Sequence, residues 1–508
     1  MSTARRILAN TFVQFAGKLI TAGLSIVVLK LITGYLGASG YGDYTTIYQF
    51  LAFFGIAADF GIYTITVKEM SKPNANIQRI LGNAMSLRTV LIIITMALAL
   101  IAAFLIPKYH GTLIPIGVAI ATLATFFTLL NGTISSVLQV YLKMQYATIS
   151  LIVGKVISVG YMIWAVTAYA HNPEAGFYQL MWSGVIGNGV MFFITAYYTR
   201  RYTKITYAFD FAYWKQIFYT SLPFGVALIL NTIYFRLDIL LMNFILPHSS
   251  VLNGVSDCVQ TLCGDTENGL YGVAMRMLEM LIIIPVYFMN SVLPVMTRYM
   301  EEQKEKVQQL IQYSFDFLVA TSMPILVGGF ILAKPIVLFI SDPEFVSGHT
   351  FIYGADIAMR ILMFAMMFSF LNALFGFTLV VLNRQKYLMY INFVAVLFNL
   401  VSNIFVIKHW GFRGAAFTSV LSELIILLFI HRVSQREMGF KLNSSSFWKY
   451  LISSLLMGLI VFLGYSWLID LWFVYQLAVL VPLGGLVYLL MVWKTGAVTP
   501  EMLRLIKK

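Results

Sequence analysis

Apolar stretches long enough to cross a lipid bilayer recur along the whole sequence, and they restrict the fold more than any other feature. A helix needs about 20 predominantly apolar residues to span the hydrocarbon core. Inside lipid every backbone polar group must be paired within the protein, which favours helices for such segments. Fourteen stretches qualify, at residues 9–33, 44–66, 80–106, 113–135, 146–170, 177–198, 216–246, 269–296, 309–332, 352–382, 387–407, 413–431, 448–468 and 473–493. The sequence therefore predicts an all-α, polytopic membrane protein with about 14 transmembrane helices.

The composition agrees with this class and gives no sign of a soluble catalytic domain. The chain is 60% hydrophobic and 11% charged, and its mean hydropathy is +0.83, well above that of a soluble domain. It has no G-x-x-x-x-G-K-[ST] phosphate loop, no H-E-x-x-H and no G-x-S-x-G. We therefore expect neither an enzyme nor a chain that hydrolyses ATP, and we expect no cofactor.

The surplus of positive charge is distributed as membrane topology requires. Lys and Arg number 34 against 21 Asp and Glu, for a net charge of +13. With a cytoplasmic N-terminus, 23 of the Lys and Arg residues fall on the cytoplasmic side, 4 outside and 7 within spans. This positive-inside pattern predicts a multi-pass protein of the cell membrane with both termini in the cytoplasm. A nucleic-acid partner is not expected.

The spans group into two lobes and an appendage. The cytoplasmic segment 199–215, rich in Tyr, Phe, Arg and Lys, is typical of a linker in the membrane interface. It separates an N-lobe at 1–198 (spans 1 to 6) from a C-lobe at 216–432 (spans 7 to 12); accessory spans 13 and 14 at 433–493 and a cytoplasmic tail at 494–508 follow. Because six is even, the second lobe enters the membrane in the same orientation as the first, which permits pseudo-symmetric lobes.

Two cysteines lie in one predicted exterior loop. Cys258 and Cys263 form a C-x4-C pair in a segment without Lys or Arg. A disulfide between them is plausible in an oxidising compartment, and two free thiols are the alternative. A metal site is not expected, since His248 is the only histidine nearby and no zinc-ligand spacing is present.

Span 1 carries a polar stripe. Its residues recur every three or four positions and therefore share one helix face; they are Thr11, Gln14, Lys18, Thr21 and Ser25. Hydrogen bonding between helices would explain such a stripe, and so would the lining of a water-filled cavity faced by Lys18. Lys30, near the exterior end of the span, can instead extend its amine to the interface.

Several charges lie too deep in the predicted bilayer to reach water easily. Arg88 and Lys155 enter from the cytoplasmic side by eight or nine residues, or roughly 12–14 Å at the helical rise. Asp59 lies at comparable depth and can neutralise only one of Lys18, Arg88 and Lys155. Ionisable residues inside membranes are usually functional or paired with one another.

The later spans contain both spaced pairs and isolated charges. Arg276 with Glu279, and Asp356 with Arg360, have the spacing of self-neutralising pairs on one helix. Arg236 and Asp238 in span 7 are two residues apart and so point to different faces. Asp316 and Glu423 are isolated acids for which we expect a structural role. Across all spans the isolated cations outnumber the isolated acids, which predicts an anionic substrate.

Three blocks of the sequence resemble the polysaccharide-transporter branch, of the O-antigen flippase type, of the multidrug/oligosaccharidyl-lipid/polysaccharide flippase superfamily. They begin "NTFVQFAGKLITAGLSIVVLK", "YFRLDILLM" with the later "NGLYGVAMRMLEML", and "LNRQKYLMYINFVAVLFNL". The resemblance covers nearly the whole chain. It implies two six-helix lobes that form a V around a central cavity, and it places Arg236 where phosphate or an anionic sugar would be met.

Together these observations predict a flippase that moves a polyprenyl-(pyro)phosphate-linked oligosaccharide to the outer leaflet by alternating access. The predicted substrate-binding residues are Lys18, Arg88, Lys155, Arg236, Gln14, Arg276 and Arg360. Asp59 and Asp238 are candidates for coupling to H⁺ or Na⁺. Expected partners are membrane lipids and the glycosyltransferases or polymerase of the same pathway. The alternatives are a cation-coupled multidrug exporter of the same superfamily and a membrane scaffold of a glycan-assembly complex that transports nothing.

Overall fold

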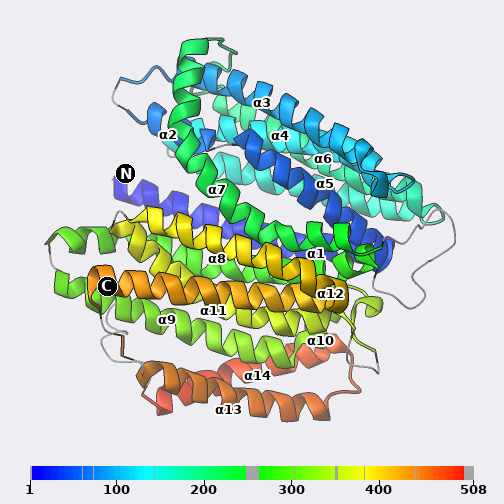
Figure 1. Ribbon diagram of the computed structural model, residues 1–508, viewed down its shortest axis with the longest axis vertical. Coiled ribbons are helices and arrows are strands. Elements are labelled where there is room, and N and C mark those ends of the chain that lie inside the picture. Colours follow the sequence, from blue (N-terminus) through cyan, green and yellow to red (C-terminus); the bar gives the residue numbers. More distant parts are fainter. Residues whose placement is uncertain are drawn as a thin grey trace. The chain divides into compact units, whose positions relative to one another are not determined.

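Every long element of the chain is a helix (Figure 1). The structure is a computed structural model that describes residues 3–59, 61–72, 74–141, 143–247, 263–302, 304–348, 353–382, 384–440, 442–443 and 445–496. No strand occurs among these residues, so the predicted all-α class is confirmed. Contacts between Cα atoms divide the chain into two units, Met1–Gly269 and Leu270–Lys508.

The first unit is built around its long first helix. Its helices are α1 (Thr3–Asp59), α2 (Ile62–Met70), α3 (Ile77–Leu105), α4 (Ile114–Val140), α5 (Met144–Ala168), α6 (Pro173–Thr199) and α7 (Phe211–Ile245). Helix α1 packs against α3, α4, α5 and α7, and α6 packs against α4 and α5. Its core includes the fully buried side chains of Ile47, Ala121 and Phe177. Their burial holds the polar groups of α1 and α3 at fixed positions.

The second unit contains the remaining helices. They are α8 (Gly264–Glu302), which starts within the first unit, α9 (Lys304–Ile331), α10 (Ala333–Ile340), α11 (Ala355–Val381), α12 (Gln385–Met438), α13 (Ser445–Trp467) and α14 (Phe473–Lys494). Helix α11 packs against α9 and α12, while α13 packs against α9 and α14. The accessory pair α13 and α14 lies side by side (Figure 1).

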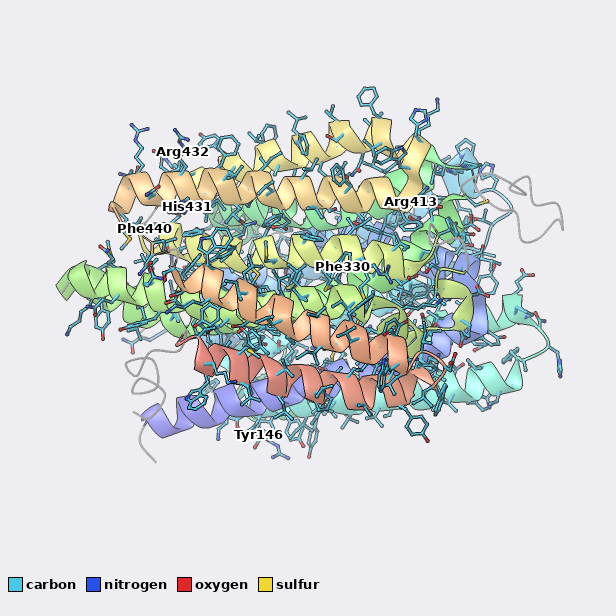
Figure 2. All side chains as sticks on the ribbon, turned by 90° about the horizontal axis from the view of Figure 1, so that it is seen from below. Tyr146, Phe330, Arg413, His431, Arg432 and Phe440 are labelled. Carbon is cyan, nitrogen blue, oxygen red and sulfur yellow. The ribbon has the colours of Figure 1, made fainter. Side chains whose placement is uncertain are left out.

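Glycine kinks divide two of the helices into two crossings each. Gly37 in α1 has φ 65° and Gly411 in α12 has φ 54°, a region that side chains with a Cβ rarely adopt. Figure 2 shows Arg413 and Arg432 at opposite ends of the second half of α12. Their 19-residue separation corresponds to about 28 Å of helix, close to the thickness of a hydrocarbon core.

The predicted number of crossings is confirmed. Eleven helices among the described residues are long and apolar enough to cross a membrane. Two of these are α1 and α12, whose halves each match one predicted span, and the 35-residue α7 supplies a further crossing. The chain is a multi-pass membrane protein with fourteen helices of membrane-spanning length.

Helix α7 packs with the first unit, against α1, α2 and α3. The predicted lobe boundary lies before this helix and stays a prediction.

The segment that precedes α7 is held at the start of α3. Arg79 Nη2 lies 2.8 Å from Asp210 Oδ2, and the amide of Asp210 donates to Asn83 Oδ1 at 2.9 Å. Tyr207, Phe209 and other aromatic side chains of this segment are exposed, as expected for the membrane interface.

Candidate functional site

A buried ion pair joins three helices of the first unit. Arg88 on α3 is 3% exposed, and its Nη2 donates to Asp59 Oδ1 at the end of the second half of α1. Its Nη1 donates to Thr133 Oγ1 on α4 at 3.0 Å. A positive charge inside a membrane protein is stabilised by a paired carboxylate. Of the three cations that Asp59 could neutralise, the structure pairs it with Arg88. Its role in substrate binding stays a prediction.

Lys18 lies on an exposed part of α1. Just before it, Gly17 approaches α5 so closely that an added Cβ would lie 2.1 Å from Thr148 Cγ2. No ion pair of Lys18 is found among the side chains that the structure describes. The Gln14 side chain lies outside the described part of the chain. Lys18 is therefore an accessible cation on the helix around which the first unit is built.

Two hydroxyls of the polar stripe, those of Thr21 and Ser25, bond within α1 itself. Thr21 Oγ1 donates to the carbonyl oxygens of Gly17 and Lys18, at 2.9 and 3.0 Å, and Ser25 Oγ donates to that of Thr21 at 2.8 Å. Hydroxyls in helices commonly bond to the preceding turn in this way. Both explanations of the stripe, hydrogen bonding between helices and the lining of a water-filled cavity, stay predictions.

Three further predicted site residues lie on α5 and α7. Lys155 on α5 is half-buried, and so is Arg236 on α7. Arg236 Nη1 donates to Gln49 Oε1 on α1, while Asp238 is 2% exposed. Both Arg236 and Asp238 are engaged in interactions of the first unit. The structure thus brings Arg236 to α1, the helix that carries Lys18, and it leaves the substrate role of both residues as a prediction.

Sequence reasoning missed a lysine that caps α7. Lys108 lies in the 3₁₀ turn Pro107–Tyr109, and its Nζ donates to the carbonyl oxygens of Asn243 and Leu246. A cation at these carbonyls satisfies acceptors that the helix end leaves open. Burial lowers the pKa of Lys108 to about 8, and the nearby Asp265 carboxylate opposes part of this shift. The only sequence signal is a lysine in a short exterior turn, against the positive-inside trend.

The lowered pKa of Lys108 predicts that stability depends on pH. Between about pH 8 and its ordinary pKa of 10.5, the unfolded chain keeps a proton that the folded chain has released. The contribution of Lys108 to the free energy of unfolding therefore rises with pH through this window and is constant at lower pH. We expect the melting temperature of the wild type, minus that of K108M, to increase from pH 8 to pH 10.5. A difference that stays constant or falls would contradict the assignment.

A second cluster that the sequence analysis missed joins α1 to the first turn of α8, within the first unit. Ser39 Oγ donates to Asp265 Oδ2, and Asn268 Nδ2 donates to Thr46 Oγ1 at 3.1 Å. Asp265, Glu267 and Asn268 are fully buried. No group of His, Cys, Asp or Glu suited to a metal ion occurs among the described residues. This cluster fastens the start of α8 to the kinked part of α1.

Both spaced charge pairs of the second unit are formed. Arg276 Nη1 lies 2.9 Å from Glu279 Oε2 with both side chains well exposed, a setting in which ion pairs contribute little. Arg360 Nη2 lies 4.0 Å from the fully buried Asp356 Oδ2. Glu423 Oε2 accepts a hydrogen bond from Asn372 Nδ2 at 2.6 Å. The carboxylate of Asp316 accepts one from Gln312 Nε2 at 3.0 Å.

The cysteine prediction falls partly on described residues. Cys263, just before α8, is disulfide-bonded, and the described part of the chain has no free cysteine. Cys258, the other cysteine of the sequence, lies outside the described residues.

Two family models match the chain, and together they cover residues 7–405. The family model described as "Polysaccharide biosynthesis protein" matches residues 7–300, more than half of the chain. A second family model, MatE, matches residues 258–405. A search of curated proteins finds no match.

Solved structures share the fold at low sequence identity. The lipid II flippase MurJ, in an inward closed conformation, aligns with a TM-score of 0.68 at 15% identity, over 95% of this chain and 98% of its own. An inward-facing multidrug resistance transporter of the MATE family in the MOP superfamily gives 0.62 at 13% identity, over 83% and 94%. A MOP superfamily transporter from Pyrococcus furiosus gives 0.56 at 12% identity, over 85% and 95%. At these identities the likeness shows the fold alone. The family match shows that this chain belongs to the polysaccharide biosynthesis protein family.

Proposed function

We propose that this transporter flips a polyprenyl-(pyro)phosphate-linked oligosaccharide from the cytoplasmic to the outer leaflet by alternating access. The anionic headgroup would pass through a cationic path formed by the first unit, while the polyprenyl chain stays in the bilayer. Glycosyltransferases and a polymerase of the same pathway would supply and consume the glycan. Family membership in polysaccharide biosynthesis supports this substrate class.

The formal charge of the first seven spans is the observation that carries the proposal. These spans contain five cations, Lys18, Lys30, Arg88, Lys155 and Arg236, against the two acids Asp59 and Asp238. The surplus holds whatever the individual pairings are, because two carboxylates cannot balance five cations. A surplus of positive charge within membrane spans is costly, and a phosphate that enters the path would offset that cost.

The pairing in the first unit narrows the candidates for each role. Since Arg88 is neutralised by Asp59, we assign the headgroup contacts in the first unit mainly to Lys18, Lys155 and Arg236, with Gln14 as a further candidate. Asp238 is then the better coupling acid for H⁺ or Na⁺, because Asp59 is occupied by a guanidinium. A fixed Arg88–Asp59 pair would position α1 and α3 during the cycle.

Flipping by purified protein tests the proposal. Proteoliposomes that contain a polyprenyl-pyrophosphate-linked oligosaccharide are exposed to a membrane-impermeant oxidant of the glycan, and the accessible fraction is followed in time. We expect K18A, K155A and R236A each to slow flipping by about tenfold or more, because a hydrogen bond to a charged group contributes about 1.5–3 kcal/mol. K72A removes an exposed lysine that pairs only with Glu69 and serves as the control. Wild-type rates in the triple variant would overturn the proposal.

A multidrug exporter is the second candidate, because the MatE model matches residues 258–405. Such an exporter of cationic drugs would need acids rather than cations along its path. Accumulation of a lipophilic cation in the same proteoliposomes, driven by a H⁺ or Na⁺ gradient, would favour this function. The charge of the spans predicts no such accumulation. A scaffold without transport would show neither activity.

A further inference from the structure

Arg360 of the second unit forms a long ion pair with Asp356, and its buried Nε has no hydrogen-bond partner among the described residues. Arg360 is on α11, and its Cζ lies 5.8 Å from the ring centroid of Phe330 on α9. Phe330 is one of the residues labelled in Figure 2. The Tyr465 hydroxyl on α13 lies within electrostatic reach of both Arg360 and Asp356. Helix α9 packs against both α11 and α13. Arg360 and Phe330 therefore face each other where α11 packs against α9.

The carboxylate nearest to Arg360 is already used by other donors. Asp356 Oδ1 accepts from the amide of Ser347 and Asp356 Oδ2 from Ser347 Oγ, both at 2.7 Å. The guanidinium lies 4.0 Å from Asp356, beyond hydrogen-bond distance. Arg360 Nε is buried and has no hydrogen-bond partner among the described residues. A guanidinium has five N–H donors, so most of those of Arg360 remain available for an acceptor outside the chain.

The region lies at the depth of the outer lipid headgroups. Arg360 is five residues from the start of α11, or about 8 Å along the helix, and Tyr465 is two residues from the end of α13. Both ends are exterior in the positive-inside topology. Trp467 and Trp472, which border the turn between α13 and α14, are largely exposed, as is typical of residues at a membrane interface.

The sequence holds Tyr465 at this place through the accessory helices. Gly464 allows α14 to approach, since an added Cβ would lie 2.7 Å from Leu480 Cδ2. Gln476 Nε2 on α14 is close to the carbonyl oxygens of Leu468 and Leu471, at 3.0 and 2.9 Å, and so closes the turn after α13. The accessory pair thereby fixes one wall of the region around Arg360.

We propose that Arg360, Tyr465 and Phe330 form a binding site for the phosphate of an outer-leaflet lipid headgroup. The planar guanidinium matches two phosphate oxygens, the Tyr465 hydroxyl supplies a third donor, and the Phe330 ring supports the cation from one face. This site belongs to the second unit alone and does not depend on which substrate the transporter flips. It gives the accessory helices α13 and α14 a role in lipid recognition.

Native mass spectrometry of the purified full chain in detergent tests this site. The probe is phosphatidylglycerol, titrated onto the wild type and onto R360Q, R360K and Y465F. We expect R360Q to weaken the tightest lipid adduct by about tenfold or more, and R360K and Y465F to weaken it less. R384Q is the matched control, because Arg384 also pairs with one carboxylate, Glu437, at 2.9 Å, but at the cytoplasmic end of the second unit.

A second titration distinguishes a lipid headgroup from free inorganic phosphate as the ligand of this site. Inorganic phosphate at constant ionic strength should leave the lipid adduct intact if the headgroup is the ligand, and should displace it if the site takes free phosphate. Either result supports phosphate recognition provided that R360Q abolishes it. Melting temperatures of all variants report folding, and a folded R360K with reduced binding supports the site even if R360Q unfolds. Equal lipid affinity of the wild type and the Arg360 variants would overturn the proposal.

Discussion

The D59A variant is expected to lose about 3 kcal/mol or more of stability in the first unit. Asp59 accepts a hydrogen bond from the Arg88 guanidinium, which is 3% exposed and lies between α1, α3 and α4. Removing the carboxylate leaves this charge buried without a counter-charge, and breaking one side of a buried pair typically costs about 3–5 kcal/mol. R88A should cost less than D59A, because the remaining Asp59 carboxylate is 29% exposed and keeps access to water.

Unfolding of the purified variants in mixed micelles measures this cost. The double variant D59L/R88M removes both charges and should recover much of the stability that D59A loses, since apolar replacements of a buried pair are often neutral. E279Q breaks the exposed pair with Arg276 and should change stability by less than about 1 kcal/mol. If D59A were as stable as E279Q, the pair would have no structural role, and Arg88 would again be a candidate for contact with the substrate.

The bilayer explains why the helices could be predicted from sequence. Its thickness sets the length of each apolar stretch, and the cost of an open backbone sets its conformation. The break between the first two spans was also visible, because "YLGASGYGDY" interrupts the apolar pattern. The fusion of these spans into one helix kinked at Gly37 was not visible, since it depends on a single backbone conformation.

The pairing of charges could not be predicted, because it is decided by which helices touch. Asp59 had three possible partners at similar depth, and the packing of α3 against α1 and α4 selects Arg88. The contact of Lys108 with the end of α7 could be predicted even less. Its acceptors are the backbone carbonyls of Asn243 and Leu246, and every residue type has such a carbonyl. The stripe on α1 does not specify partners either, because Thr21 and Ser25 bond to backbone carbonyls of their own helix.

Substitution of Gly42 or Gly269 by alanine is expected to separate the first turn of α8 from α1. An added Cβ on Gly42 would lie 1.7 Å from the carbonyl oxygen of Asp265, and one on Gly269 would lie 2.0 Å from that of Ala38. Both obstacles are backbone atoms, so no side-chain rotation can relieve them. The two segments would have to move apart, and the buried Asp265 would lose its hydrogen bond from Ser39. Overpacking alone costs about 1–3 kcal/mol, and the loss of the Ser39–Asp265 hydrogen bond adds to this cost.

G23A is the matched control for these two variants, because an added Cβ at Gly23 on the same helix meets nothing within 4 Å. Alanine at an exposed helical position should be neutral or slightly stabilising. Thermal unfolding should therefore show a clearly lower melting temperature for G42A and for G269A than for the wild type, and no decrease for G23A. The double variant G42A/G269A should lose less than the sum of the single losses, since one separation of α1 and α8 relieves both clashes and neighbouring sites are not additive. Additive losses would mean that the two glycines act through different contacts, and unchanged stability in either single variant would show that the start of α8 is not held against α1.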